Sequence, residues 1–270
     1  MTAAEPTILY GTAWKEERTR ALTLQALAHG YRAIDTANQR KHYVEAAVGE
    51  AIAASGVPRD ALFVQTKFTY ARGQDHRLPY DPEAPLPTQV AQSFARSCEH
   101  LGTDVLDSYV LHGPWSNHGW TDEDRAVWGA MEALVDAGRV RHLGVSNVAD
   151  AQLAALFAAA RIAPHYVQNR CYARTGWDRE VRATCARHGA VYQGFSLLTA
   201  NQRELADPRL AAIAKAHGVA PSGVVFAFAR AVGMLPLTGT SSPAHLDEDR
   251  AALGIALTAA ERATIEAVGG

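Results

Sequence analysis

Three ionisable side chains, Asp35, Lys67 and His112, each follow directly on a short β-prone run of the sequence. A buried lysine is costly unless it is paired, and Asp35 is the available partner for Lys67. Tyr43 comes eight residues after Asp35 and would lean back over the same site, where the ammonium of Lys67 would lower the pKa of its phenol. A neutral His112 would donate a hydrogen bond to a carbonyl oxygen. These four side chains therefore suit the acid-assisted interconversion of a carbonyl and an alcohol.

The elements that would position these residues alternate regularly along the chain. Short β-prone runs are separated by Ala- and Leu-rich stretches whose apolar residues recur at a helical spacing. The expected strands are Ile8–Tyr10, Arg32–Ile34, Leu62–Thr66, Val105–Leu111, Val140–Val145, Tyr166–Gln168, Ala190–Gly194 and Met234–Leu237. The expected helices cover residues 18–29, 44–54, 87–101, 123–137, 150–160, 178–188, 207–217, 221–232, 243–253 and 258–268.

This alternation indicates the fold class. Strands that alternate with helices pair in parallel, and eight such units close naturally into a barrel. A doubly wound open sheet is the alternative, but the glycines do not supply the GxGxxG turn expected after its first strand. We therefore expect an α/β fold, a single (β/α)8 TIM barrel that forms one domain over residues 1–270.

In such a barrel, functional side chains gather at the carboxyl ends of the strands. The residues at the expected strand exits are Thr12, Asp35, Lys67, His112, Ser146-Asn147, Gln168, Phe195-Ser196 and Thr238-Gly239-Thr240. Some polar residues follow strands in any barrel, so Thr12 or Gln168 taken singly is weak evidence for a functional site. An Asp, a Lys and a His on consecutive strands, which lie roughly 4.8 Å apart, would converge over one mouth.

Composition narrows the class of protein. The chain has 270 residues, of which 48% are hydrophobic and 20% charged, with a formal net charge of −2. This near-neutral chain lacks the clustered basic residues of a nucleic-acid-binding protein. No apolar run approaches the roughly 20 residues of a membrane helix. Cys98, Cys171 and Cys185 are widely spaced, which indicates reduced thiols and no metal site. We expect a cytoplasmic enzyme, monomeric or weakly oligomeric, that binds a small molecule and neither nucleic acid nor membrane.

Several longer motifs resemble those of a known family, the aldo-keto reductases. The Trp128 to Asn147 stretch, which ends in Gly-Val-Ser-Asn, is the most specific of them. The other motifs, in chain order, are Tyr10-Gly-Thr-Ala-Trp-Lys15, Tyr31-Arg-Ala-Ile-Asp-Thr-Ala37 with Val48-Gly49, Leu62-Phe-Val-Gln-Thr-Lys67 and Asp107-Ser-Tyr-Val-Leu-His-Gly-Pro114. The resemblance as a whole runs from the first strand to the last helix, and these motifs come in the order that the family has.

The resemblance implies an oxidoreductase that reduces aldehydes or ketones with NADPH, the hydride passing directly to the carbonyl carbon. In that family's scheme Tyr43 is the proton donor, Lys67 tunes it, Asp35 anchors Lys67 and His112 orients the carbonyl. Ser146, Asn147 and Gln168 match positions that hold the nicotinamide carboxamide, and Phe195 the aromatic on which its ring stacks. The nucleotide-binding residues that the resemblance implies are Gly11, Thr12, Ser146, Asn147, Gln168, Phe195, Ser196, Leu198, Thr199, Thr238, Gly239, Thr240, His245, Glu248 and Asp249.

The tyrosine motif departs from the family's pattern. The family has its tyrosine a few residues closer to the Asp, at a position that Arg40 occupies here. We interpret the difference as a short insertion that moves the proton donor to Tyr43. The alternative is that Arg40 or His42 enters the site.

A second departure concerns the segment after the last strand, which resembles the family's 2′-phosphate and adenine site. Gly239 replaces a Lys, His245 an Arg and Asp249 an Asn, whereas Thr240 and Glu248 fit the pattern. The loss of both permanent cations weakens the expected grip on a phosphate dianion. We expect NADPH as the cofactor, with NADH as the alternative.

Two long loops, residues 68–86 and 113–122, would cover the mouth of the barrel, and loops of this length are usually functional. Their aromatic residues would either wall a substrate pocket or pin the loops onto the barrel. We expect Trp14, Tyr70 and Trp115 to contact substrate, and Trp177 is a further candidate wall. Because the chain ends soon after its last expected helix, we also expect an open mouth that no residue after Leu257 closes.

Two other functions remain open at this point. The chain would be a regulatory or scaffold subunit that binds nicotinamide nucleotide without turnover, or a redox-neutral lyase or cyclase using the same acid. The displaced tyrosine and the altered phosphate site motivate the first of these. The retained Asp35, Lys67 and His112 argue against it, because a non-catalytic barrel has no reason to keep a buried Asp–Lys pair.

Overall fold

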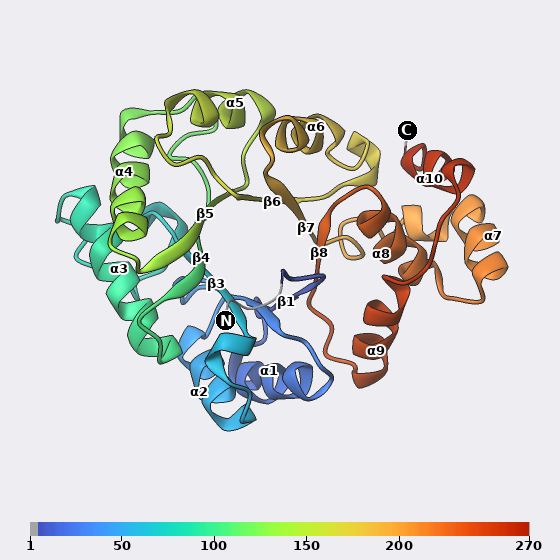
Figure 1. Ribbon diagram of the computed structural model, residues 1–270, viewed down its shortest axis with the longest axis horizontal. Coiled ribbons are helices and arrows are strands. Elements are labelled where there is room, and N and C mark those ends of the chain that lie inside the picture. The colour runs from blue at the N-terminus through green and yellow to red at the C-terminus, as the bar shows by residue number, and fades with distance from the viewer. Residues whose placement is uncertain (1–4, 270) are drawn as a thin grey trace.

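The computed structural model describes residues 5–269 and shows a closed barrel of parallel strands surrounded by helices (Figure 1). Every strand pairs with its neighbours in chain order, and β1 closes the barrel against β8. The strands are β1 Leu9–Gly11, β2 Ala33–Asp35, β3 Phe63–Phe68, β4 Leu106–Leu111, β5 Val140–Ser146, β6 Tyr166–Arg170, β7 Val191–Phe195 and β8 Leu235–Thr238. The predicted (β/α)8 barrel and its eight strands are confirmed, with ends that shift by one or two residues.

Helices form a ring around the strands, as Figure 1 shows. They are α1 Thr19–Ala28, α2 Glu45–Ser55, α3 Leu86–Leu101, α4 Asp122–Asp136, α5 Asp150–Ala159, α6 Arg179–His188, α7 Pro208–His217, α8 Pro221–Ala231, α9 Pro243–Ala252 and α10 Ala259–Glu266. Each corresponds to a predicted helix. The capping boxes at Thr121 and Thr258 explain where α4 and α10 begin, because each threonine accepts a hydrogen bond from a backbone N–H of the first turn. The short 3-10 turns, such as η1 Glu16–Arg18 and η3 Ala71–Gly73, were not predicted.

The barrel has an apolar layer inside it and a larger apolar core around it. Side chains alternate between the two sides of each strand, so every second residue faces the barrel axis. A small buried cluster of Leu9, Ala33, Phe63, Tyr166 and Leu235 fills the amino-terminal part of the interior. The larger cluster packs the strands against the helices. Beyond this apolar layer, Asp35, Lys67 and Gln168 lie towards the end of the barrel where the strands finish.

One helix pair approaches unusually closely. A Cβ added at Gly49 in α2 would lie 1.8 Å from the backbone oxygen of His100 in α3. No side chain larger than hydrogen fits there while the two backbones stay in place. The position therefore requires glycine for close packing, and α2 leads directly from the loop that carries Tyr43.

Among the described residues, no single helix is long and apolar enough to cross a membrane; α7 and α8 pass that test only as a pair, bent by 86° between them.

Candidate active site

A cavity of about 710 Å³ opens at the carboxyl ends of the strands. The predicted site residues that line it are Gly11, Trp14, Asp35, Tyr43, Tyr70, His112, Ser146, Asn147, Gln168, Phe195, Ser196, Leu198, Thr199, Thr238, Gly239, Thr240, His245 and Asp249. Thr12, Lys67, Trp115 and Glu248 lie outside this lining. Tyr43 and His112 reach the cavity from the loops after β2 and β4, whereas Phe195 ends β7 and Asp249 lies in α9, after β8.

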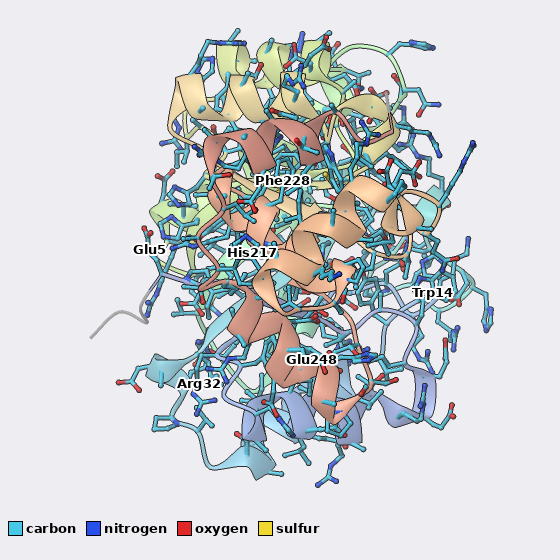
Figure 2. All side chains as sticks on the ribbon, turned by 90° about the vertical axis from the view of Figure 1, so that its right-hand side faces the viewer. Glu5, Trp14, Arg32, His217, Phe228 and Glu248 are labelled. Atoms are coloured by element: carbon cyan, nitrogen blue, oxygen red, sulfur yellow. The ribbon has the colours of Figure 1, made fainter. Side chains whose placement is uncertain are left out.

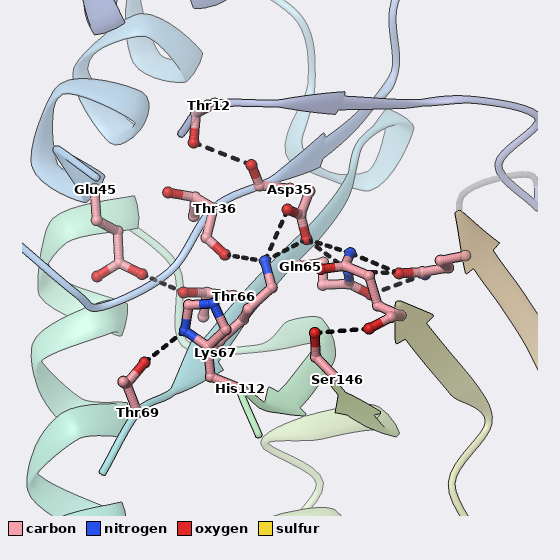
Figure 3. A network of polar contacts seen from close by, with 12 residues as sticks. Thr12, Asp35, Thr36, Glu45, Gln65, Thr66, Lys67, Thr69, His112 and Ser146 are labelled. Carbon is pink, nitrogen blue, oxygen red and sulfur yellow. Dashed lines mark hydrogen bonds and ion pairs between the residues drawn. The ribbon is translucent and has the colours of Figure 1, made fainter. Parts of the chain in front are cut away.

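Lys67 and Asp35 form a buried ion pair beneath the cavity. Lys67 Nζ lies 2.6 and 2.7 Å from the two carboxylate oxygens of Asp35 and donates a further hydrogen bond of 2.8 Å to the backbone oxygen of Thr36 (Figure 3). The lysine is fully buried and Asp35 nearly so. Burial lowers the pKa of Lys67, and the adjacent Asp35 acts in the opposite direction. The pairing predicted from the sequence is therefore present, with all three ammonium protons used.

Glutamine side chains hold Asp35 from the other side. Gln65 Nε2 donates to Asp35 Oδ1 at 2.7 Å, and Gln168 Nε2 donates to the same oxygen at 3.1 Å. Gln193 connects the two glutamines across the barrel, because its Oε1 accepts from both at 2.9 Å. Figure 3 shows this network running from β2 and β3 towards the strands on the far side. It fixes the carboxylate rigidly, and with it the position of the Lys67 charge.

Tyr43 stands directly over that charge. Lys67 Nζ lies 5.5 Å from the centroid of its ring, and the rings of Tyr43 and His112 meet edge to face with centroids 6.0 Å apart. Among the described residues the Tyr43 hydroxyl has no hydrogen-bond partner, and the residue lines the cavity.

We expected the ammonium to lower the pKa of this tyrosine, and that expectation is wrong for the structure. Burial, reinforced by the Asp35 carboxylate, raises the pKa of Tyr43 well above its usual value. The phenol therefore stays protonated at neutral pH and is available as a proton donor.

His112 begins the loop after β4. Its Nδ1 lies 2.7 Å from Oγ1 of Thr69, a buried residue that directly follows β3. Burial, followed by the nearby charges of Lys67 and His42, lowers the pKa of His112 to about 3. The imidazole is neutral at physiological pH, as the sequence predicted.

The segment between Asp35 and α2 puts Tyr43, and not Arg40, at the cavity. Arg40 points outwards, with Nη1 3.7 Å from a carboxylate oxygen of Glu16. His42 does line the cavity, where its ring packs on Trp14 at an angle of 37°, with centroids 3.9 Å apart. Trp14 is 68% exposed and lies at the end of the molecule opposite to Glu5 (Figure 2).

At the Phe195 end of the cavity, two residues adopt left-handed backbone conformations that side chains rarely take. Asn147 after β5 has φ 54° and Ser196 after β7 has φ 56°. Strained residues of this kind cluster at functional sites. Asn147 Nδ2 donates to the backbone oxygen of His112 at 2.8 Å, which ties the two ends of the cavity together. Phe195 is half-buried and lines the cavity, and the guanidinium carbon of Arg170 lies 5.4 Å from the centroid of its ring.

The far end of the cavity lies between β8 and the start of α9. Thr238 Oγ1 donates to Asp249 Oδ2 at 2.7 Å, and burial raises the pKa of Asp249 to about 6. Ser242 caps α9 by accepting from the backbone N–H of His245. Glu248 points to solvent from the same helix (Figure 2).

The two long loops are pinned to the barrel as well as lining its mouth. Tyr70 faces the cavity and packs edge to face on Trp115, with ring centroids 5.0 Å apart. The buried Asp124 of α4 accepts from the Tyr70 hydroxyl at 3.0 Å and from the Trp115 backbone N–H at 2.6 Å. Trp115 therefore supports the wall that Tyr70 forms. Trp177 is fully buried in the core, which is a correction to its expected place at the mouth.

Residues near the C-terminal end of the described chain do not close the cavity. Its last lining residue is Asp249, and α10 packs against α7 and α8. No described residue after Leu257 contributes to the lining, as expected from the sequence.

Several residues that build the site were missed. Gln65 and Gln193 lie two positions before Lys67 and Phe195 on the same strands, so the two-residue period of a strand was the signal that could have found them. Thr69 and Arg72 lie in a loop whose path has no periodic signal. Arg72 lines the cavity, stacks on Tyr70 and donates to the backbone oxygen of Pro114.

Comparison with known proteins identifies the family of this barrel. The model of the Aldo/keto reductase family matches residues 7–269, and the chain belongs to that family of oxidoreductases. It is 33% identical over 244 residues to an aldo-keto reductase of Mycolicibacterium vanbaalenii, an alignment that covers 90% of this chain and 80% of that protein. It is 30% identical to the 2,5-diketo-D-gluconic acid reductase B of a Corynebacterium species, over 88% of this chain and 80% of that protein. Among solved structures, an aldo/keto reductase from Brucella melitensis superposes with a TM-score of 0.83 at 26% identity, covering 97% of this chain and 95% of the other.

Proposed function

We propose that this protein reduces aldehydes or ketones to alcohols, with Tyr43 as the proton donor and NADPH as the cofactor. The observation that carries the proposal is the meeting of Tyr43, His112 and the Lys67–Asp35 pair at one end of a single cavity. Enzymes of this family are nicotinamide-dependent carbonyl reductases. A cytoplasmic location and a monomeric or weakly oligomeric state stay predictions.

The residues at the other end of the cavity fit a nicotinamide nucleotide. Phe195 offers an aromatic face, and Ser146 and Asn147 offer polar groups beside it. Gly239 leaves room on the cavity side of β8, because a Cβ there would meet only the backbone oxygen of Gly11, at 3.7 Å. Gln168 would hold the nicotinamide carboxamide only by sharing or exchanging its present bonds to Asp35 and Gln193. A bound reduced nicotinamide supplies the hydride that the carbonyl carbon accepts.

The protein's own groups then handle the charge and the proton on the carbonyl oxygen. His112 is neutral and donates a hydrogen bond to this oxygen, so negative charge that develops there is stabilised. The Tyr43 hydroxyl transfers its proton to the same oxygen, because a phenol is a stronger acid than the alcohol that forms. The tyrosinate left behind lies over the Lys67 ammonium, whose charge stabilises it. Asp35 and its glutamine partners hold the lysine in place throughout.

Initial rates test this function. NADPH oxidation with a panel of small aldehydes and ketones, with NADH in parallel, is expected to show turnover in the wild-type protein. Tyr43→Phe is expected to lower kcat by about 10²-fold or more, the usual contribution of a general acid, while nucleotide binding followed by tryptophan fluorescence is unchanged. Tyr172→Phe is the matched control, since Tyr172 is half-buried and outside the cavity lining.

The alternatives give different results in the same assay. Nucleotide binding without turnover of any carbonyl would support a regulatory or scaffold subunit. Conversion of a substrate with no net oxidation of the nucleotide would support a redox-neutral enzyme. Activity that survives in Tyr43→Phe would place the acid on another residue.

A further inference from the structure

Arg72 is a cation of the cavity that no carboxylate neutralises. It lies in the loop after β3, within the 3-10 turn η3 Ala71–Gly73, and its side chain lines the cavity. Arg77, in the same loop, is held by Asp75, with Nε 3.1 Å from Oδ1. Among the described residues, no carboxylate oxygen lies within 4.0 Å of the guanidinium nitrogens of Arg72. Its charge is therefore free to meet a ligand.

The guanidinium of Arg72 is nevertheless held in place. Its central carbon lies 5.5 Å from the ring centroid of Tyr70 and 5.1 Å from that of Trp115. Nη2 donates a hydrogen bond to the backbone oxygen of Pro114, and most of the other N–H donors of the group remain free. Two aromatic contacts and one hydrogen bond restrict a long side chain, so less conformational entropy is lost when a ligand binds to it.

The turn that carries Arg72 is tied to the loops of the reacting groups. Gln39 Nε2 donates to the backbone oxygen of Gly73 at 2.6 Å, and Gln39 belongs to the loop that carries Tyr43. Pro114, which accepts from the guanidinium, belongs to the loop that begins with His112. These contacts fix the guanidinium relative to the two side chains that would receive a carbonyl oxygen. An anion bound there would therefore be part of the carbonyl substrate.

The other charges of the cavity agree with an anionic substrate. The carboxylates of the described residues that line the cavity are Asp35 and Asp249. Asp35 is paired with Lys67, and Asp249 accepts a hydrogen bond from Thr238. Arg170 also lines the cavity, and within the described part of the chain no carboxylate lies within 4.0 Å of its guanidinium nitrogens. The side-chain charges that a substrate would meet are thus positive.

We propose that Arg72 binds a carboxylate carried by the substrate, so that the preferred substrates are oxo acids, aldehydes or ketones that bear a carboxylate group. A guanidinium matches a carboxylate with two parallel hydrogen bonds, which gives direction as well as attraction. This inference rests on the proposed function, because it names the substrate class of the same site. Arg72 determines specificity and takes no part in the transfer of the hydride or the proton.

Matched pairs of substrates test the role of the charge. The first pair is 4-formylbenzoate and 4-formylbenzamide, which share their shape and their aldehyde and differ in charge. The second pair, 3-formylbenzoate and 3-formylbenzamide, places the charge at another distance from the aldehyde. With wild-type protein and NADPH at pH 7, kcat/KM for at least one acid is expected to exceed that for its amide by about 10-fold, the scale of one charge-assisted hydrogen bond.

Three variants are compared on these substrates. Arg72→Met removes the charge but keeps an unbranched side chain, and it is expected to lower kcat/KM for the preferred acid by about 10-fold, mainly through KM, and for the amide by less than twofold. Arg72→Lys keeps the charge without the planar fork and is expected to retain an intermediate preference. Arg174→Met is the matched control, because Arg174 is exposed, lies outside the cavity lining and packs over Tyr172 with its guanidinium carbon 4.3 Å from the ring centroid. Its rates are expected to match those of the wild type.

The ratio of acid to amide separates this role from a structural one. If Arg72 only supported the wall formed by Tyr70 and Trp115, Arg72→Met would lower kcat/KM for the acid and the amide equally. Added salt gives a second readout: it is expected to reduce the ratio of the wild type and to leave that of Arg72→Met unchanged.

Two results would overturn the proposal. The first is an acid-to-amide ratio in Arg72→Met within twofold of the wild-type ratio, and the second is a wild-type protein that reduces benzaldehyde but prefers neither acid to its amide. A wild-type protein that reduces none of the acids, the amides or benzaldehyde would instead reject the proposed function itself.

Discussion

Oγ1 of Thr69 and Nδ1 of His112 lie 2.7 Å apart, and this contact decides which edge of the imidazole carries the proton. The Thr69 side chain is buried and its hydroxyl has no other partner among the described residues. If the hydroxyl only accepted a bond from Nδ1–H, its own proton would be left unpaired, which is costly. The hydroxyl therefore donates to Nδ1, and the proton of the neutral ring is on Nε2, ready for a carbonyl oxygen.

Thr69→Val is expected to lower kcat for carbonyl reduction by roughly 5- to 10-fold, because the loss of one hydrogen bond of about 1 kcal/mol frees the imidazole to exchange tautomers. Thr69→Ser keeps the hydroxyl and is expected to stay within twofold of the wild type. Steady-state kinetics with a small aldehyde, together with imidazole ¹⁵N shifts, check both. Equal rates in the valine and serine variants would remove Thr69 from any role in orienting His112.

The depressed pKa of His112 predicts how stability depends on pH. In the folded protein burial lowers its pKa to about 3, whereas the ordinary value is 6.5, so below pH 6.5 the unfolded chain binds a proton that the folded chain refuses. The stability contributed by neutral His112 is fully present above pH 6.5 and is lost progressively as the pH falls towards 3. Urea unfolding at pH 7.5, 6 and 5 is expected to show a shallower loss in His112→Gln, by up to about 1.4 kcal/mol per pH unit. His118→Gln, at an exposed histidine in the same loop, is expected to keep the wild-type slope.

Gly239→Lys is expected to raise the preference for NADP⁺ over NAD⁺ by about 10-fold, since a cation at this position beside α9 would contact the extra phosphate. The substitution fits, because a Cβ at this position meets nothing closer than 3.7 Å. The ratio of the two dissociation constants measures the effect. Gly254→Lys, which adds the same charge at an exposed turn outside the cavity lining, is the control, and an equal change in both variants would contradict a local effect.

Gly49→Ala is expected to destabilise the fold by about 1–3 kcal/mol, because its Cβ would overlap the backbone oxygen of His100 and force α2 away from α3. Gly129→Ala in α4 is the matched control with the opposite sign. Position 129 is exposed and open, so alanine there is expected to stabilise the helix by roughly 0.5–1 kcal/mol. Midpoints of thermal unfolding measure both changes in stability. A Gly49→Ala protein as stable as the wild type would show that α2 and α3 move apart with little loss of folding free energy.

The strand-end residues of the site were predictable because a barrel gathers whatever follows its strands. Asp35 ends β2, Lys67 lies near the end of β3 and His112 directly follows β4, so knowledge of the three strands was enough to bring these residues together. Tyr43 was harder, since it lies in a loop, and its assignment depended on how many residues separate it from Asp35 and α2.

The properties of the site that the sequence could not predict depend on contacts with residues from distant segments of the chain. The direction of the Tyr43 pKa shift follows from burial, which outweighs the nearby ammonium, and burial is not visible in a motif. Thr69 and His112 are 43 residues apart, and only the path of two irregular loops brings them into contact. Lys15 belongs to a sequence motif, but only the structure shows that its side chain is buried and that its ammonium donates to the backbone oxygen of Gly239.

The division of the cavity between the two halves of the chain has a consequence for inheritance. Tyr43, Thr69 and His112 come from the loops after β2 to β4, whereas Phe195 ends β7, and Thr240 and Asp249 come from the segment after β8. A single genetic crossover within α4 would therefore join the reactive end of one relative to the opposite end of another. Recombination between two relatives could therefore combine the reactive residues of one with the Phe195 side of the cavity of the other, without a point mutation in either part.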